Sequence, residues 1–204
     1  MKKNTDELWI ISSRPKCIDD MLLTDEMEKI IYKNRYNHTL INGPIGTGKT
    51  VLAEAITNFN ARIIDCKSSN ELEEIFKYAD EINSVIIKNI DIFYDRVDDI
   101  IEVYNMKNVI FITRDENSSD LSIFKNCNII HTNQFLPKNN NSYKKYQNYL
   151  RKLLKSKQIG FDSNNDQYQL NTLEMYEKLW PRLRQLVRHA QMRSKSNKWV
   201  PIPV

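Results

Sequence analysis

The stretch "LINGPIGTGKTVLAEAI", residues 40–56, constrains the fold more than any other part of this 204-residue chain. The whole chain has four glycines, and three of them, Gly43, Gly46 and Gly48, lie within six residues of this stretch. Residues 43–50 fit the pattern G-x-x-x-x-G-K-[ST], with a short β-branched run before them and an amphipathic helical pattern after them. A strand, a glycine-rich loop and a helix in this order form the setting in which the pattern binds phosphate groups.

A loop that surrounds a polyphosphate needs glycine for two reasons. Successive backbone N–H groups must reach the phosphate oxygens without side chains in the way, and some positions need a positive φ. Lys49 then brings a positive charge to the β- and γ-phosphates, and the Thr50 hydroxyl is a ligand for Mg²⁺. The helix that follows presents its positive N-terminal end to the phosphates. The candidate binding residues are Gly43, Pro44, Ile45, Gly46, Thr47, Gly48, Lys49, Thr50 and Val51.

We therefore expect ATP and Mg²⁺ as cofactors, the alternative being a glycine-rich turn that holds no ligand. The pattern alone leaves ATP, dATP and GTP open, although the guanine-reading sequence N-K-x-D is absent from the chain.

Five short apolar runs predict the strands of a parallel sheet that is buried on both faces. They are "HTLIN", "ARIID", "SVIIKNIDIF", "NVIFIT" and "NIIHT". Helical patterns separate them, over residues 51–58, 71–81, 95–105 and 119–126. Alternating strands and helices predict a doubly wound α/β sheet of five parallel strands, with the nucleotide at the carboxyl ends of the strands.

The character of the chain changes after residue 137. Residues 1–137 carry 16 Lys and Arg against 22 Asp and Glu, whereas residues 138–204 carry 14 against 4, so the net charges are −6 and +10. We expect an α/β domain over 1–137, a small basic helical domain over 138–196 and an extended tail over 197–204. The basic segment indicates either an anionic partner such as nucleic acid or simply a solvated helical surface.

Several classes of protein are disfavoured by the same composition. There is no run of 18 apolar residues, and the lysines at the start are not followed by an apolar signal segment. The three cysteines are widely spaced, which favours free thiols in a reducing compartment. We expect a cytoplasmic protein with no membrane partner.

These features together resemble the AAA+ ATPases, most closely the clamp-loader and replication-initiator branch. The segment "LWIISSRPKCIDDMLLTDEMEKI" is similar to the opening of clamp-loader small subunits, and "NCNIIHTNQFLP" to a later family stretch. "LRKLLKSKQIGFDS" is similar to the beginning of the helical lid, and "PRLRQLV" to the sensor 2 helix. The resemblance covers about residues 8–192 and includes no counterpart of the collar domain that clamp loaders carry.

The resemblance implies roles for residues outside the loop. It places Ile11, Arg14 and Pro15 beside the adenine base, and Arg184 over the γ-phosphate. It also implies that the segment 138–196 is the AAA+ lid. Sensor 1, a polar residue at the end of the fourth strand, would be Thr113 or Asp115.

The chain departs from the family pattern where hydrolysis is carried out. The family has h-h-h-h-D-E at the end of the third strand, but here "VIIKNID" puts Lys88 or Asn89 in the Asp position and Asn89 or Ile90 in the Glu position. Asp91 can substitute only if a bulge shifts the strand end. Lys125 stands where the family has an arginine that acts on a neighbouring subunit, and lysine lacks the planar fork of arginine. The expected catalytic residues are therefore Lys49, Asp91 and Arg184.

These departures predict an ATP-binding AAA+ protein of DNA replication, either initiator- or clamp-loader-like or a regulator of such proteins, with weak or partner-dependent hydrolysis. Its expected partners are DNA or a replication protein, bound through residues 138–204, and an AAA+ partner subunit. The alternative is an ATP-driven DNA motor, such as a helicase loader or a viral DNA-packaging ATPase. A third interpretation is an interaction module that keeps the nucleotide pocket as part of its fold.

Overall fold

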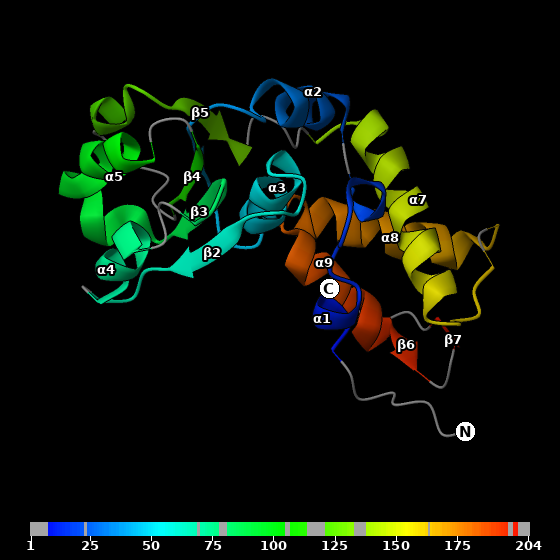
Figure 1. Cartoon of the computed structure of the whole chain (residues 1–204). Coiled ribbons are helices and arrows are strands. Elements are labelled where there is room, and N and C mark those ends of the chain that lie inside the picture. Colours follow the sequence, from blue (N-terminus) through cyan, green and yellow to red (C-terminus); the bar gives the residue numbers. More distant parts are fainter. Residues whose placement is uncertain are drawn as a thin grey trace. The chain divides into compact units, whose positions relative to one another are not determined.

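The computed structural model divides the chain into two compact units (Figure 1). The sheet unit is Asp25–Phe135, and the helical unit combines Met1–Thr24 with Leu136–Val204. The structure describes residues 8–22, 24–68, 70–77, 81–104, 107–113, 121–132, 138–162, 164–195 and 198–199. The expected linker around Pro137 and most of the expected tail lie outside these residues.

The sheet unit contains five parallel strands in the order β2-β3-β4-β1-β5. The strands are β1 (Thr39–Asn42), β2 (Arg62–Asp65), β3 (Ser84–Lys88), β4 (Asn108–Ile112) and β5 (Asn128–His131). Every residue of β1 and β4 is buried, as expected for central strands that are covered on both faces. The predicted α/β class and the five parallel strands are confirmed.

The third strand is shorter than its apolar run predicts. β3 ends at Lys88, because Asn89 adopts a left-handed conformation with a φ of 56°. The chain then continues as a 3₁₀ helix, η2 (Ile90–Arg96), in which Ile90 and Phe93 of the run are buried and Ile92 is exposed. A left-handed Asn is a common way to stop a regular element, since its side chain tolerates this region better than most.

Within its described residues, the sheet unit contains one α-helix before β1 and three that connect its strands. They are α2 (Asp25–Lys33), α3 (Lys49–Ile56), α4 (Asn70–Lys77) and α5 (Val97–Val103). The helix expected over 119–126 appears as a short 3₁₀ helix, η3 (Leu121–Phe124), within the described part of that range. The other three expected helices are present: α3 has the expected length but begins two residues earlier, and the described α4 and α5 are shorter than expected.

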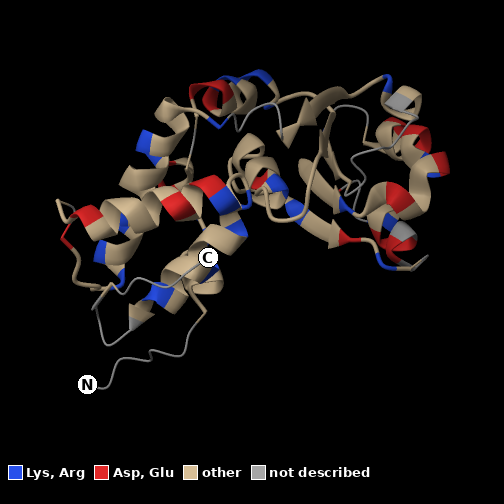
Figure 2. Ribbon diagram, turned by 180° about the vertical axis from the view of Figure 1, so that it is seen from behind, with Lys and Arg blue, Asp and Glu red and all other residues tan. Residues whose placement is uncertain are grey.

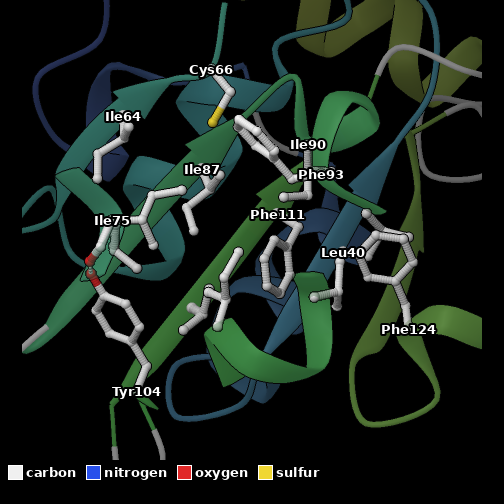
Figure 3. Close-up of a cluster of buried hydrophobic side chains, with 14 residues drawn as sticks. Leu40, Ile64, Cys66, Ile75, Ile87, Ile90, Phe93, Tyr104, Phe111 and Phe124 are labelled. Carbon is white, nitrogen blue, oxygen red and sulfur yellow. Dashed lines mark hydrogen bonds between the residues drawn. The ribbon is translucent and has the colours of Figure 1, made fainter. Parts of the chain in front are cut away.

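A cluster of buried apolar side chains includes residues of β1, β2, β3 and β4 (Figure 3). Side chains from β1 to β4, including Leu40, Ile87 and Phe111, meet those of η2, α5 and η3. Phe111 and Phe124 are in edge-to-face contact with ring centroids 5.5 Å apart. Tyr104, at the end of α5, is fully buried and donates a hydrogen bond of 2.7 Å to the carbonyl oxygen of Ile75, which satisfies its hydroxyl inside the core.

The helical unit is built from α1 (Trp9–Ser12), η1 (Ile18–Asp20), α7 (Asn140–Ser156), α8 (Asp166–Leu179) and α9 (Leu183–Arg193), with a short hairpin of β6 (Ser194–Lys195) and β7 (Lys198–Trp199). Asn139 and Asn165 cap α7 and α8, because their side-chain oxygens accept backbone N–H bonds from the first turns. Among the residues that the structure describes, no helix combines the length and apolar character needed to cross a membrane.

The observed division differs from the expected boundaries at both ends. The N-terminal segment belongs with the helical unit, because Trp9 is buried there and its backbone N–H donates to Oε1 of Gln191 at 3.0 Å. Lys157 also donates to the Ser12 hydroxyl at 2.5 Å. Within the expected tail, the backbone N–H of Trp199 bonds the carbonyl of Gly160 at 3.1 Å, so the hairpin is fixed to the helices.

The Tyr104 hydroxyl allows a test of the core. We expect Tyr104→Phe to lower the free energy of unfolding by about 1–2 kcal/mol, because the buried carbonyl of Ile75 loses its hydrogen-bond donor. Urea denaturation measures this difference. Tyr36→Phe is the matched control, since Tyr36 is 91% exposed. Equal effects of the two substitutions would contradict the assigned hydrogen bond.

Candidate nucleotide-binding site

The glycine-rich loop connects β1 to α3 and has the backbone that its sequence predicts. Gly43, Gly46 and Gly48 have φ values of 142°, 92° and 88°, a region that side chains disfavour. Gly48 lies directly before the first residue of α3 and gives that helix no side-chain cap. The first N–H groups of α3 therefore face the loop without a capping side chain, which is the arrangement that helix N-termini use to bind anions.

Thr132, the residue directly after β5, contacts two residues of the glycine-rich loop. Its Oγ1 lies 3.0 Å from Oγ1 of Thr47, which also donates to the carbonyl of Pro44 at 3.0 Å. The same hydroxyl lies so close to Gly43 that a Cβ on Gly43 would collide with it. Glycine at position 43 is thus required both by its φ and by the approach of Thr132. Sequence reasoning missed Thr132; the available signal was a hydroxyl residue at the carboxyl end of a predicted strand.

Lys49 lies within the loop and is 8% exposed. Its Nζ donates hydrogen bonds to the carbonyl oxygens of Gly43 and, at 2.8 Å, Pro44. These bonds hold a positive charge inside the curve of the backbone, where the sequence predicts the β- and γ-phosphates. The next residue, Thr50, is in the first turn of α3, as its expected role as a Mg²⁺ ligand requires.

A second cluster of polar side chains, those of Asp91, Tyr94 and Thr113, follows the carboxyl ends of β3 and β4. The glycine-rich loop follows the carboxyl end of β1, at the same edge of the sheet. The hydroxyls of Thr113 and Tyr94 both donate to Oδ1 of Asp91, the latter at 2.8 Å, and the two hydroxyls lie 3.2 Å apart. The backbone N–H of Thr113 bonds the carbonyl of Ile41 in β1 at 3.2 Å. The structure therefore joins two residues that the sequence analysis singled out separately, Asp91 and Thr113. The alternative sensor, Asp115, lies outside the described residues.

The end of β3 carries a cation where the family pattern has carboxylates. Lys88 forms an ion pair with Asp65, with 2.6 Å between Nζ and Oδ2. The Asn89 amide donates to Oδ1 of the same carboxylate. Asp65 ends β2, the neighbour of β3, and sequence reasoning missed it. Its carboxylate is bound by Lys88 and Asn89, and residues 88 and 89 supply no acidic pair at the end of β3.

No described group of three or more His, Cys, Asp or Glu side chains is arranged to hold a metal ion by itself. Mg²⁺ commonly binds through one or two protein ligands together with substrate phosphates, and the donor set here, a Thr50 hydroxyl beside the glycine-rich loop, suits that mode.

Two of the three thiols, those of Cys66 and Cys127, do not offer a competing site. Burial, followed by the charge of Asp98, raises the pKa of Cys127 to about 12. Burial, followed by the charge of Glu71, raises the pKa of Cys66 to about 11. Both side chains are therefore protonated at neutral pH, and a protonated thiol is a poor nucleophile.

The remaining candidate residues belong to the helical unit or lie on the surface. Ile11 and Arg14 are exposed in the N-terminal segment, with Pro15 half-buried beside them. Arg184 is exposed in the first turn of α9, and Lys125 is exposed after η3. The assignment of Ile11, Arg14 and Pro15 to the base, and of Arg184 to the γ-phosphate, stays a prediction.

No protein-family model matches the chain. Three curated relatives are similar to parts of it. A replication factor C large subunit from Aeropyrum pernix is 32% identical over 108 residues, or 45% of this chain and 22% of the relative. A small subunit from Haloarcula marismortui is 36% identical over 55 residues, or 25% and 17%. A probable replication factor C subunit 5 from Dictyostelium discoideum is 32% identical over 73 residues, or 31% and 21%.

The chain spans about a fifth of the length of these relatives. In structure, it is similar to NtrX from Brucella abortus, solved in complex with ATP, with a TM-score of 0.58 at 14% identity. That match covers 90% of this chain and 54% of NtrX. The strand order β2-β3-β4-β1-β5, the glycine-rich loop after β1 and this match together show that the chain has the AAA+ ATPase fold, with local sequence similarity to replication factor C subunits.

Proposed function

We propose that the chain binds ATP with Mg²⁺ through residues 43–51 and acts in DNA replication with weak or partner-dependent hydrolysis. ATP binding is supported most strongly by the geometry of the glycine-rich loop. Three glycines at positive φ lead into the uncapped start of α3, with the Lys49 ammonium held inside the curve. The partial similarity to replication factor C subunits supports the assignment to replication.

Weak hydrolysis follows from the charges at the end of β3. Phosphoryl transfer needs a metal-ordering acid and a group that positions the attacking water, and catalysis consists almost entirely of such positioning and charge compensation. Here Lys88 occupies the strand end and is neutralised by Asp65. Among the described residues at this edge, Asp91 is the carboxylate that remains for the water, but one of its oxygens already accepts bonds from Tyr94 and Thr113.

ATP turnover tests this proposal. We expect the purified chain to gain thermal stability from MgATP while hydrolysing it more slowly than about 1 s⁻¹, the lower range of efficient phosphoryl-transfer enzymes. Asp91→Asn should remove most of the residual turnover and leave the stabilisation by ATP in place.

Lys49→Ala should abolish the stabilisation by ATP, whereas Lys29→Ala, an exposed lysine on α2, is the matched control and should not. Stabilisation by ATP that survives Lys49→Ala would refute binding at the loop, and brisk hydrolysis by the wild-type chain would refute the interpretation of β3.

The Thr132 hydroxyl gives a second test of the same loop. We expect Thr132→Val to weaken ATP binding about fivefold, because the loop loses one hydrogen bond of about 1 kcal/mol. Gly43→Ala should weaken it further, since its Cβ collides with Thr132 and its φ becomes strained. Calorimetric titration with ATP measures both effects.

The matched control for Thr132→Val is Thr172→Val. Thr172 is also fully buried and donates to the Tyr168 carbonyl at 2.7 Å, but it lies on α8 in the helical unit. This control should lower stability without changing ATP affinity. A wild-type affinity for Gly43→Ala would show that the loop does not contact the phosphates.

For the partner, we propose DNA bound by exposed lysines of the helical unit. Lys144, Lys152 and Lys155 are exposed on α7 and share one side of the helix, within a segment of net charge +10. Figure 2 shows Lys and Arg recurring along the helices of this unit. Lysines spaced along a helix can neutralise successive phosphates and release their counterions, which gives affinity without reading the base sequence.

The salt dependence of DNA binding tests this proposal. We expect log affinity to fall linearly with log salt concentration. Charge reversal of Lys144, Lys152 and Lys155 to glutamate should reduce the slope by roughly one for each phosphate that the helix no longer neutralises. Reversal of Lys29, Lys33 and Lys77, which are exposed in the sheet unit, is the control. If the α7 substitutions leave the slope unchanged, DNA does not bind this helix, and a protein partner is favoured instead.

A further inference from the structure

The side chain of Asp91 is held by two hydroxyl groups that come from different elements. Tyr94, three residues later in η2, donates to Oδ1 of Asp91 at 2.8 Å, and Thr113, directly after β4, donates to the same oxygen. Each hydroxyl has one hydrogen to donate, so both hydrogens are used by this one carboxylate oxygen. Among the described residues, none donates a hydrogen bond to Oδ2 of this exposed side chain. Oδ2 is therefore the oxygen that is left to bind water.

The ring of Tyr94 is anchored by packing, while its hydroxyl reaches the carboxylate. The ring meets Phe124 edge to face, with centroids 5.8 Å apart and an interplanar angle of 85°. Phe124 is fully buried and packs in turn on Phe111 of β4. A hydroxyl on a ring that packing already fixes loses little freedom when it forms a hydrogen bond. Tyr94 thus presents its hydroxyl to Asp91 at a defined place.

Thr113 connects the same carboxylate to the strand that leads into the glycine-rich loop. It is fully buried, and its backbone N–H donates to the carbonyl of Ile41 in β1 at 3.2 Å. Continued by one residue, the register of β1 and β4 puts Thr113 at the level of Asn42, the residue directly before the loop. The end of β4 therefore keeps the Asp91 carboxylate at the edge of the sheet where the loop begins.

We propose that Tyr94 is a positioning residue for ATP hydrolysis. Its hydroxyl, together with that of Thr113, fixes Oδ1 of Asp91 and leaves Oδ2 to accept a hydrogen bond from the attacking water. This inference rests on the proposed function, in which Asp91 serves the residual turnover. A carboxylate that is held by one oxygen has a defined direction for the other, and phosphoryl transfer depends on such positioning.

The hydrolytic step gives Tyr94 an indirect role. The water oxygen forms a bond to the γ-phosphorus of ATP, and the bond from that phosphorus to the β,γ-bridging oxygen breaks with its electron pair leaving on ADP. Oδ2 of Asp91 takes the proton that the water loses and later releases it to solvent. Tyr94 acts through Asp91 in this scheme and needs no contact with ATP.

Single-turnover hydrolysis of γ-labelled MgATP by the full chain, with the protein in excess, tests this role. We expect Tyr94→Phe, which keeps the ring and removes the hydroxyl, to lower the rate about tenfold, because the Asp91 carboxylate loses a hydrogen bond. ATP affinity, measured by calorimetric titration, should not change. Tyr104→Phe is the matched control: it also loses a hydroxyl hydrogen bond in the sheet unit, and it should leave the rate unchanged.

A double-mutant cycle shows whether Tyr94 acts through Asp91. In the Asp91→Asn background, Tyr94→Phe should have almost no further effect on the rate, since the carboxylate that it positions is already gone. A merely structural role of the hydroxyl predicts the same proportional fall in both backgrounds, and that result overturns the proposal.

Thr113 gives an independent check on the same carboxylate. Thr113→Val should lower the rate, whereas Thr113→Ser, which keeps the hydroxyl, should retain it. If Tyr94→Phe does not fold, a Thr113→Ser variant that is as slow as Thr113→Val overturns the proposal.

The outcomes separate this inference from the proposed function. If Asp91→Asn lowers the rate and Tyr94→Phe does not, Tyr94 has no positioning role and the proposed function stands. If the wild-type chain shows no hydrolysis at all, this inference is refuted while ATP binding at the loop stands. If stabilisation by ATP survives Lys49→Ala, the proposed binding site is refuted, and this inference is refuted with it.

Discussion

The close approach of Thr132 to Gly43 is the constraint on which the loop depends. Parallel pairing places β5 beside β1, in the register Asn42 to His131, so the residue that follows β5 lies against the residue that follows β1. Only a glycine leaves room there, and its φ of 142° turns the chain away from the strand direction. The two later glycines complete the turn into α3. The shape of the glycine-rich loop is thus set by the pairing of two strands as well as by the loop's own sequence.

The same sheet edge is the basis of the proposal that this chain binds ATP but hydrolyses it slowly. The loop after β1 keeps the features needed to hold phosphates, whereas the end of β3 carries Lys88 and Asn89 bonded to Asp65. A lysine–aspartate pair at this position keeps the corner folded and close to neutral, but it leaves no carboxylate pair for metal and water. Asp91 reaches the edge because the left-handed Asn89 turns the chain into η2 two residues earlier. The chain has the AAA+ fold, and this arrangement supports the proposal that nucleotide binding is retained while turnover is slow.

The sequence predicted the local features well, because periodicity and glycine chemistry act over a few residues. The five strands, the strand–loop–helix junction and the positive φ values at the glycines could all be predicted. The end of β3 could not, since an apolar run does not show where a left-handed residue stops the sheet. Thr132 and Asp65 were missed because their partners, Thr47 and Lys88, are distant in the chain. The same reason explains the N-terminal segment, which packs on α9 through Trp9 and Gln191, 182 residues apart.

The most direct test of the central claim is an NMR titration of the isotope-labelled chain with MgATP. The account predicts that the backbone amide signals of Gly46, Gly48, Lys49 and Thr50 shift together and saturate, because these N–H groups are the ones that would bond to the phosphate oxygens. Amide signals of β2, at the far edge of the sheet, should stay in place. Loop signals that do not move at millimolar MgATP would contradict the account.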